Sequence, residues 1–127
     1  MKVAEIMVKN VCSSHADITL DELALMMWNE DCGCVPLINE QRQPVGVVTD
    51  RDIAIASALQ HKAPWDIYAH ELSADKPLYL CSETDDVKVA LELMQTHQIR
   101  RVIVVNDDGE LAGIISMGDV LARTGAG

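Results

Sequence analysis

Apolar residues recur along this chain with two spacings, one typical of helices and one typical of strands. Apolar side chains three and four positions apart predict a helix that begins near residue 20 and buries one face; they are Leu20, Leu23, Ala24 and Met27. Thr19 and Glu22 have the spacing of a capping box, in which two side chains satisfy amides at a helix start. Asn29–Gly33 is expected to end this helix, with Gly33 as its terminator, because glycine readily adopts the left-handed conformation found there.

The next segment predicts a β-hairpin followed by a second helix. Val35–Ile38 and Val45–Thr49 are short apolar runs, and the polar residues 39–44 separate them. Pro36 has no N–H to donate to a sheet, so it is expected at the start of its strand. A helix then begins near Asp50 and runs through Ala58.

The end of this hairpin is repeated later in the chain. Gly46–Asp52 reads Gly, two β-branched residues, a hydroxyl residue, two variable residues and Asp, and Gly113–Asp119 has the same pattern 67 positions later. The helical pattern also returns 67 positions later, at Val87, Ala90, Leu91 and Met94. Strands at 102–105 and 111–116 and a helix over 117–123 complete the second copy. An α/β (α+β) chain is therefore predicted, with two copies of a strand, helix, strand, strand, helix unit.

Short segments at the repeat boundaries are less regular. A lead-in over residues 1–10 is expected to hold one helical turn at Val3–Met7. Val11–Ser13 and Leu78–Leu80 are the expected first strands of the two copies.

The repeat also predicts where one copy ends and the next begins. The first repeat is assigned to residues 1–60, a connector to 61–70 and the second repeat to 71–124. Pro64 supports the first boundary, because proline breaks a preceding helix. The tail over 124–127 is expected to be loose.

Composition and charge narrow the class of protein. The 127 residues are 49% hydrophobic and 24% charged, which is ordinary for a globular domain. A net charge of −10 disfavours nucleic acid and anionic membrane surfaces as partners. No apolar run approaches the roughly 18 residues of a membrane span, and the N-terminus lacks a signal-peptide pattern. A cytoplasmic location is the expectation, and four cysteines are compatible with a reducing compartment.

Four segments together resemble the CBS domain, named for cystathionine β-synthase, in its usual tandem form. They are Val35–Ile38 with Gly46–Ile53, and Val102–Val105 with Gly113–Val120. The resemblance implies a pseudo-twofold module of two β-α-β-β-α repeats with clefts between them. In relatives these clefts bind adenosyl compounds: AMP, ADP, ATP, S-adenosylmethionine or NAD. It further implies a flat homodimer and a regulatory role, here in a free-standing module.

The repeated junction carries residues suited to a nucleotide. Asp52 and Asp119 can each accept two hydrogen bonds from a ribose diol, and charge-assisted bonds are the stronger kind. Thr49 and Ser116 lie at helix starts, where free amides and the helix dipole favour a phosphate. The same residues are also capping pairs, with a hydroxyl at the N-cap and a carboxylate in the first turn. Capping and ligand contact are compatible.

Three arginines are candidate phosphate ligands, since arginine binds phosphate with two parallel hydrogen bonds. Arg100 and Arg101 precede a strand of the second copy, whereas the first copy has Gly33 and Cys34 at the matching positions. Arg51 lies in the first turn of a helix, where the dipole disfavours a cation. A solvent-facing role is the alternative for all three, and the two clefts are expected to differ.

An adenine ring needs an apolar slot, and six residues are candidates for its walls, with a place in the core as the alternative for each. They are Met7, Val11, Val35, Leu80, Val102 and Ile114.

Two of the four cysteines lie close together in the sequence. Cys32 and Cys34 form a Cys-x-Cys pair, which is short of the four ligands of a tetrahedral metal site. Small buried residues are the favoured interpretation, and a metal or redox role is the alternative. No nucleophile–base pair or Walker-type phosphate loop is present, so catalysis is not expected.

The favoured function is a non-enzymatic sensor that binds an adenine nucleotide, requires no cofactor and acts on an unidentified protein partner. The alternatives are a ligand-free dimerisation scaffold and a thiol-based metal or redox sensor.

Overall fold

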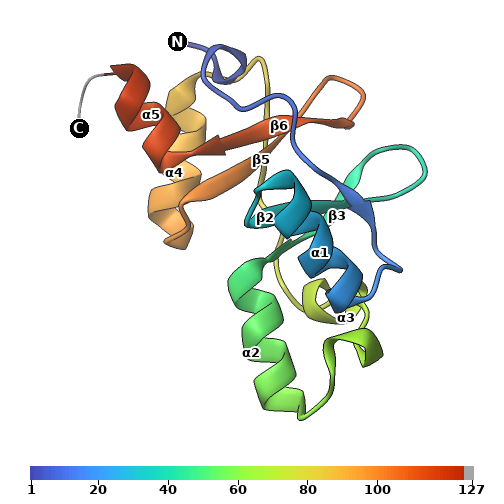
Figure 1. Cartoon of the computed structure of the whole chain (residues 1–127). Helices are drawn as coiled ribbons and strands as arrows, with labels where there is room; N and C mark the ends of the chain where they lie inside the picture. Colours follow the sequence, from blue (N-terminus) through green and yellow to red (C-terminus); the bar gives the residue numbers. More distant parts are fainter. Residues whose placement is uncertain (125–127) are drawn as a thin grey trace. The chain divides into compact units, whose positions relative to one another are not determined.

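Two compact units make up the chain (Figure 1). The computed structural model describes residues 1–124. Unit 1 contains Met1–Val11 together with the chain from Tyr79 onward, and unit 2 contains Cys12–Leu78. Each unit is a three-stranded sheet with helices packed on it. Among the described residues, no helix has the length and apolar character required to cross a membrane.

Unit 2 is built from the first copy of the repeat. Its main elements are β1 (Ser14–His15), α1 (Leu20–Glu30), β2 (Cys34–Ile38), β3 (Pro44–Thr49) and α2 (Asp50–Gln60). Strand β2 is central; β1 pairs with it in parallel and β3 in antiparallel orientation. A 3-10 turn, η2 (Pro64–Asp66), and the short helix α3 (Ala69–Ser73) follow α2.

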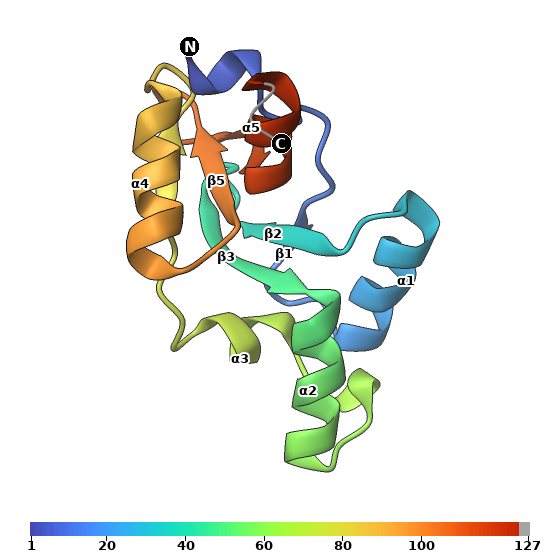
Figure 2. The same ribbon diagram turned by 90° about the vertical axis from the view of Figure 1, so that its left-hand side faces the viewer.

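Unit 1 has the same plan. Its elements are η1 (Val3–Glu5), β4 (Leu80–Ser82), α4 (Val87–His97), β5 (Arg101–Val105), β6 (Leu111–Ser116) and α5 (Met117–Thr124). Strand β5 is central, with β4 parallel and β6 antiparallel to it. Helices α4 and α5 pack on β5 and β6 and on one another (Figure 2). From α4 through α5, each element begins 67 positions after its counterpart in unit 2. The predicted fold class and the repeated β-α-β-β-α order are thus confirmed.

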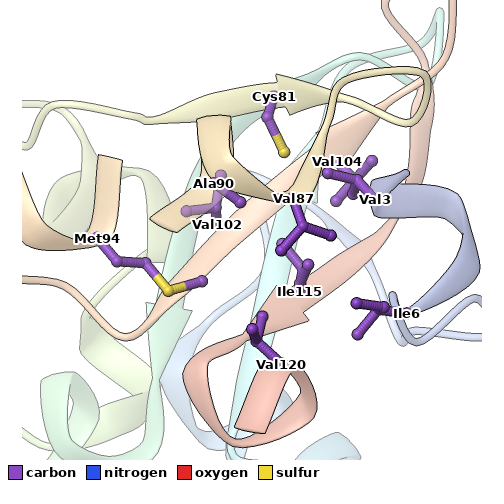
Figure 3. Packing of buried hydrophobic residues seen from close by; sticks show 10 residues of the cluster. All are labelled: Val3, Ile6, Cys81, Val87, Ala90, Met94, Val102, Val104, Ile115 and Val120. Atoms are coloured by element: carbon purple, nitrogen blue, oxygen red, sulfur yellow. The ribbon is translucent and has the colours of Figure 1, made fainter. Parts of the chain in front are cut away.

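Each unit buries its own hydrophobic cluster. In unit 1, Val3 and Ile6 from the lead-in lie in one cluster with Val87 of α4 and Val104 of β5 (Figure 3). The cluster of unit 2 contains mainly aliphatic residues of α1, the hairpin and α2, including Leu23. Aliphatic and β-branched side chains pack well on a pleated sheet, which is how a chain without phenylalanine forms both cores.

The segment that precedes each repeat packs in the unit formed by the other repeat. In unit 1, the Val8 amide donates to the Ile114 carbonyl at 2.8 Å, and the Ile114 amide donates back at 3.0 Å. In unit 2, α3 packs on β3, and Ser73 lies against Gly46. Because α3 lies 67 positions after residues 2–6, the two lead-ins are exchanged between the units. The compact units therefore differ from the stretches of sequence that repeat, and the predicted boundaries of the repeats stay a prediction.

Two predictions about the caps of α1 are wrong. Thr19 is the N-cap, but its hydroxyl donates to Asp21 at 2.6 Å instead of forming a box with Glu22. The first helical amide, that of Leu20, is satisfied from the connector by the Ile67 carbonyl at 3.0 Å. The helix ends at a left-handed Asp31, not at Gly33, because a short polar side chain tolerates that conformation.

The first and last residues of several strands also differ from the prediction. The first strands lie two or three residues later than expected, at Ser14–His15 and Leu80–Ser82. Both are short parallel strands, whose extent depends on the partner strand and not on their own residue pattern. Pro36 is the third residue of β2 and not the first; β1 pairs with β2 only beyond it, from Leu37 onward. The lead-in forms the predicted turn in a shorter, 3-10 form. The predicted loose tail begins one residue too early, since Thr124 is the last residue of α5, and residues 125–127 lie outside the described residues.

Gly113 permits the close approach between β6 and the lead-in, and this approach is testable. A Cβ atom at Gly113 would lie 2.5 Å from the Val8 carbonyl oxygen and 2.9 Å from the Met7 sulfur. We expect Gly113→Ala to lower the free energy of unfolding by about 1–3 kcal/mol, because a backbone carbonyl cannot yield easily. Urea denaturation measures this change. Gly118→Ala is the matched control, since its Cβ would meet only the Ser116 hydroxyl at 3.8 Å. Equal stability of both variants would contradict the assigned contact.

Candidate functional site

The junction between β6 and α5 places polar groups at a helix start in unit 1. The Asp119 amide donates to the Ser116 hydroxyl at 3.1 Å, and the Ser116 amide donates to the Asp119 carboxylate at 3.0 Å. This reciprocal pair confirms the capping interpretation of both residues. The carboxylate oxygens and the hydroxyl retain further lone pairs, so capping leaves both groups able to bind a ligand.

Two arginines are held at the same helix start. The Met117 amide, the first of α5, donates to the Arg100 carbonyl at 2.8 Å, which ties the beginning of β5 to α5. Arg100 and Arg101 are both exposed. A helix N-terminus carries a partial positive charge, and two guanidinium groups beside it make this corner of unit 1 favourable for an anion.

A cleft of about 880 Å³ opens at this corner. Its lining combines the arginines and the α5 start with apolar side chains from α4, α5 and the turn after α4, and consists of Met94, Gln98, Ile99, Arg100, Arg101, Ser116, Met117, Gly118 and Leu121. The volume is within the range of pockets that hold nucleotide-sized ligands. Of the predicted site residues, Arg100, Arg101 and Ser116 line this cleft. The apolar lining was not predicted, although Met94 belongs to the repeated helix pattern that could have indicated it.

Asp119 lines a second, smaller pocket of about 250 Å³ in unit 1. Its neighbours there are Ile6 of the lead-in and Ala122 and Arg123 of α5. The first turn of α5 thus presents Ser116 to the large cleft and Asp119 to the small pocket. A ligand that contacts both residues has to extend around this turn.

The equivalent junction in unit 2 has a different electrostatic state. The Thr49 amide donates to the Asp52 carboxylate at 2.8 Å, and the Asp52 amide donates to the Thr49 hydroxyl at 3.1 Å. The Lys76 ammonium forms an ion pair with the other carboxylate oxygen at 2.8 Å. Partial burial raises the pKa of Asp52, but the hydrogen bonds from Lys76 and Thr49 outweigh it and hold the pKa below its ordinary value. The carboxylate predicted to bind ribose in this unit is therefore already paired with a lysine.

Unit 2 also has a pocket at the position equivalent to the large cleft, but it is smaller and acidic. Its volume is about 250 Å³. Met27, Cys32 and Asp50 line it, 67 positions before three residues of the large cleft, and Ala24, Trp28 and Ile53 complete it. Asp50 thus stands where unit 1 has a methionine. Arg51 is exposed in the first turn of α2 beside Asp50, whose carboxylate accepts its amide at 2.8 Å.

The net charge of unit 2 is also more negative than that of unit 1, in agreement with its more acidic pocket. Unit 2 carries four of the ten basic residues and eleven of the twenty acidic residues, a net charge of −7, whereas unit 1 carries −3. The less acidic unit is also the one that holds the two arginines at the large cleft.

The six residues predicted to surround an adenine ring are distributed over several environments. Val35 and Val102 are buried in the cores of their units, and Ile114 is 8% exposed and bonded through its backbone to Val8. Met7 and Val11 are half-buried, and Leu80 is exposed. None of the six lines the large cleft. The core alternative thus holds for the two valines, and the sequence pattern alone did not separate core positions from ligand positions.

Two cysteines of unit 2 that are distant in the sequence are in contact. The Cys32 sulfur lies 2.8 Å from the Cys12 sulfur. Burial first, and then the Cys12 thiol, raise the pKa of Cys32 to about 12. Within residues 1–124, no three His, Cys, Asp or Glu side chains are grouped so that they could hold a metal ion.

The fold and the repeated strand–helix junction define a tandem module of two small α/β repeats, and comparison with known proteins identifies the family. The family model described as "CBS domain" matches residues 3–59 and 69–124. The chain belongs to the CBS-domain family, with two tandem copies.

Two curated relatives come from archaea. An uncharacterized protein of Methanopyrus kandleri is 32% identical over 121 residues, which are 95% of this chain and 61% of the relative. Inosine-5'-monophosphate dehydrogenase of Methanocaldococcus jannaschii is 27% identical over 123 residues, 96% of this chain and 23% of that enzyme. The chain therefore spans less than two-thirds of the length of either relative.

Similar solved structures cover nearly the whole chain. A CBS domain protein from Pyrobaculum aerophilum complexed with AMP is 28% identical, with a TM-score of 0.83 and 100% coverage of both chains. A CBS domain pair in complex with 5'-methylthioadenosine and S-adenosyl-L-methionine is 25% identical, with a TM-score of 0.81 and coverage of 99% and 97%. Hypoxic Response Protein I with two coordinated zinc ions is 29% identical, with a TM-score of 0.83 and coverage of 97% and 98%.

The Asp52–Lys76 ion pair makes a prediction about pH. The folded-state pKa of Asp52 is below its unfolded value, so the pair stabilises the fold above the unfolded pKa and this stabilisation is lost as the pH falls through the folded pKa. We expect Lys76→Met to raise the pKa of Asp52, measured by NMR titration of the carboxyl carbon. The Lys76 side chain is 53% exposed, so the loss of stability at neutral pH should be about 1 kcal/mol or less. Lys62→Met removes another exposed lysine as the control. An unchanged Asp52 pKa in Lys76→Met would contradict the pairing.

Proposed function

We propose that this chain is a non-enzymatic regulatory module that binds an adenosyl ligand carrying a phosphate, such as AMP, at the start of α5 in unit 1. The observation that carries the proposal is the cleft of about 880 Å³ in which Arg100, Arg101 and Ser116 surround a helix N-terminus. The relatives support the ligand class, because one similar structure contains AMP and another contains two adenosyl compounds.

The phosphate is assigned to the arginine side of the cleft. A guanidinium forms charge-assisted hydrogen bonds with phosphate, and these are stronger than bonds between neutral groups. Local positive charge is needed here, because the chain as a whole carries −10 and repels anions at long range. Ser116 adds a hydroxyl at the same helix start.

The ribose is assigned to Asp119, which lies three residues from Ser116 on the same turn. Its carboxylate already accepts the Ser116 amide and can accept the ribose hydroxyls with its remaining lone pairs. The nucleoside then reaches from the large cleft around the first turn of α5 towards the small pocket that Asp119 lines. In unit 2, binding at Asp52 has to compete with Lys76, so unit 1 is the preferred site for the nucleotide.

Regulation would follow from a ligand that binds two states of the module with different affinity. The shift in the balance between the states is limited by that difference in affinity. The partner protein would recognise the altered surface of the module.

A ligand-free homodimeric scaffold is the second candidate function, and one observation favours it. The helices of unit 2 expose large apolar side chains, including Leu25 at 60%, Trp28 at 83% and Leu59 at 75%. Exposed apolar patches often mark association surfaces. A scaffold without a physiological ligand predicts that no nucleotide raises the melting temperature, whereas the sensor predicts a rise of several degrees at saturating ligand.

The phosphate assignment is tested by comparing AMP with adenosine. We expect the double variant Arg100→Ala, Arg101→Ala to bind AMP at least roughly tenfold more weakly, because charge-assisted hydrogen bonds contribute about 1.5–3 kcal/mol each. Adenosine, which lacks the phosphate, should bind the variant as it binds the parent protein. Isothermal titration calorimetry measures both. Arg42→Asn removes an exposed arginine from the hairpin turn of unit 2 and controls for the loss of a positive charge outside the cleft. A parallel loss of AMP and adenosine binding would contradict a phosphate role.

The ribose assignment predicts different outcomes in the two units. Asp119→Asn should weaken adenosine binding by roughly tenfold or more, since it removes a charged acceptor and keeps the shape of the side chain. Asp52→Asn should change adenosine affinity little, because Lys76 holds that carboxylate. Circular dichroism verifies that both variants are folded. If the two substitutions weaken adenosine binding equally, unit 1 is not the preferred site.

A further inference from the structure

Two half-buried cysteines of unit 2 are in direct contact. The Cys12 and Cys32 sulfurs are 2.8 Å apart, although the residues are 20 positions apart in the sequence. Cys12 precedes β1, and Cys32 lies in the turn between α1 and β2. A disulfide bond is about 2.0 Å long, so the sulfurs need to approach by less than about 1 Å to bond.

The surroundings of Cys32 favour its protonated thiol. Burial and the neighbouring Cys12 thiol raise the pKa of Cys32 to about 12. Cys81 is 4% exposed in the core of unit 1, so a small oxidant has little access to it. Cys12 and Cys32 are less buried than Cys81 and can be reached by a small oxidant.

We propose that Cys12 and Cys32 form a reversible disulfide that closes a loop within unit 2. This proposal does not depend on adenosyl binding. In reducing compartments such disulfides are usually transient and redox-sensing, and contact between the thiols before oxidation places the second sulfur next to a mixed disulfide on the first.

The reaction is a thiol–disulfide exchange with a low-molecular-weight disulfide such as oxidised glutathione. One cysteine thiolate attacks the glutathione disulfide, whose S–S bond breaks to release one glutathione thiol and leave a mixed disulfide. The second cysteine then attacks the protein sulfur of the mixed disulfide and releases the second glutathione thiol. The two protein thiols are oxidised, one glutathione disulfide is reduced, and their two protons end on the two glutathione thiols.

The position of the bond links the redox state to two features of the fold. Cys12 is the first residue of unit 2 after the chain leaves unit 1 at Val11. Cys32 lines the acidic pocket of unit 2 with Met27 and Asp50. Oxidation would therefore fix the start of unit 2 to the α1–β2 turn and reshape the wall of that pocket.

The test uses the full chain equilibrated with mixtures of reduced and oxidised glutathione, quenched with acid and alkylated. Peptide mapping under non-reducing conditions should find a Cys12–Cys32 link within one chain, with an intact mass lower by two hydrogen atoms. Alkylation of Cys12 and Cys32 should fall at least roughly tenfold on oxidation, while alkylation of Cys34 stays the same. The melting temperature of the oxidised protein should rise by several degrees, because the bond restricts the unfolded chain.

Matched variants separate this pair from the alternatives. Cys12→Ser and Cys32→Ser should each abolish the mass change and the rise in melting temperature, whereas Cys34→Ser should retain both. A Cys32–Cys34 link, a bond between two chains, or a mixed disulfide with glutathione that persists would overturn the proposal. So would co-purified zinc that is lost in Cys12→Ser. The peptide map of the parent protein decides the question even if a variant fails to fold.

Discussion

The capped junction between the hairpin and the following helix is the constraint on which both units depend. At each junction a hydroxyl and a carboxylate three residues apart satisfy two backbone amides, and a carbonyl from the preceding turn accepts the first amide of the helix. That carbonyl belongs to Gly33 in unit 2 and to Arg100 in unit 1. The junction therefore fixes the angle between strand and helix. It also fixes the position of the residue immediately before the central strand. In unit 1 this residue is an arginine at the cleft.

The same backbone arrangement thus supports two helix starts whose surrounding side chains differ in charge. Substitutions at equivalent positions replace Gly33 and Cys34 of unit 2 by Arg100 and Arg101 of unit 1. Lys76 pairs with the capping carboxylate in unit 2, whereas the large cleft with its arginines lies in unit 1. The capping hydrogen bonds are donated by backbone amides and do not involve these neighbouring side chains. The charge beside each helix start can therefore change without loss of the fold. This separation of frame from charge is the physical basis for assigning the nucleotide to one unit.

Exchange of the lead-ins gives the short segments before each repeat a structural role. The lead-in of unit 1 contributes Val3 and Ile6 to the core around α4 and α5 (Figure 3). The lead-in of unit 2 supplies α3 against β3 and continues to Lys76, which reaches the carboxylate at the helix start. The point where the chain passes from unit 1 into unit 2 is Cys12. A bond from Cys12 to the α1–β2 turn would act at this passage, and the same turn borders the pocket of unit 2.

The sequence by itself determined the features that arise from neighbours in the chain. The 67-residue repeat, the order of strands and helices, and the Ser116–Asp119 and Thr49–Asp52 caps follow from residues a few positions apart. Only the tertiary structure decided which lead-in packs in which unit, that Lys76 holds Asp52 across 24 positions, and that Cys12 touches Cys32 across 20 positions. These contacts join residues that the path of the chain brings together, and no local spacing encodes that path. The valines predicted to hold adenine lie in the cores for the same reason: an apolar pattern specifies burial, but not what covers the side chain.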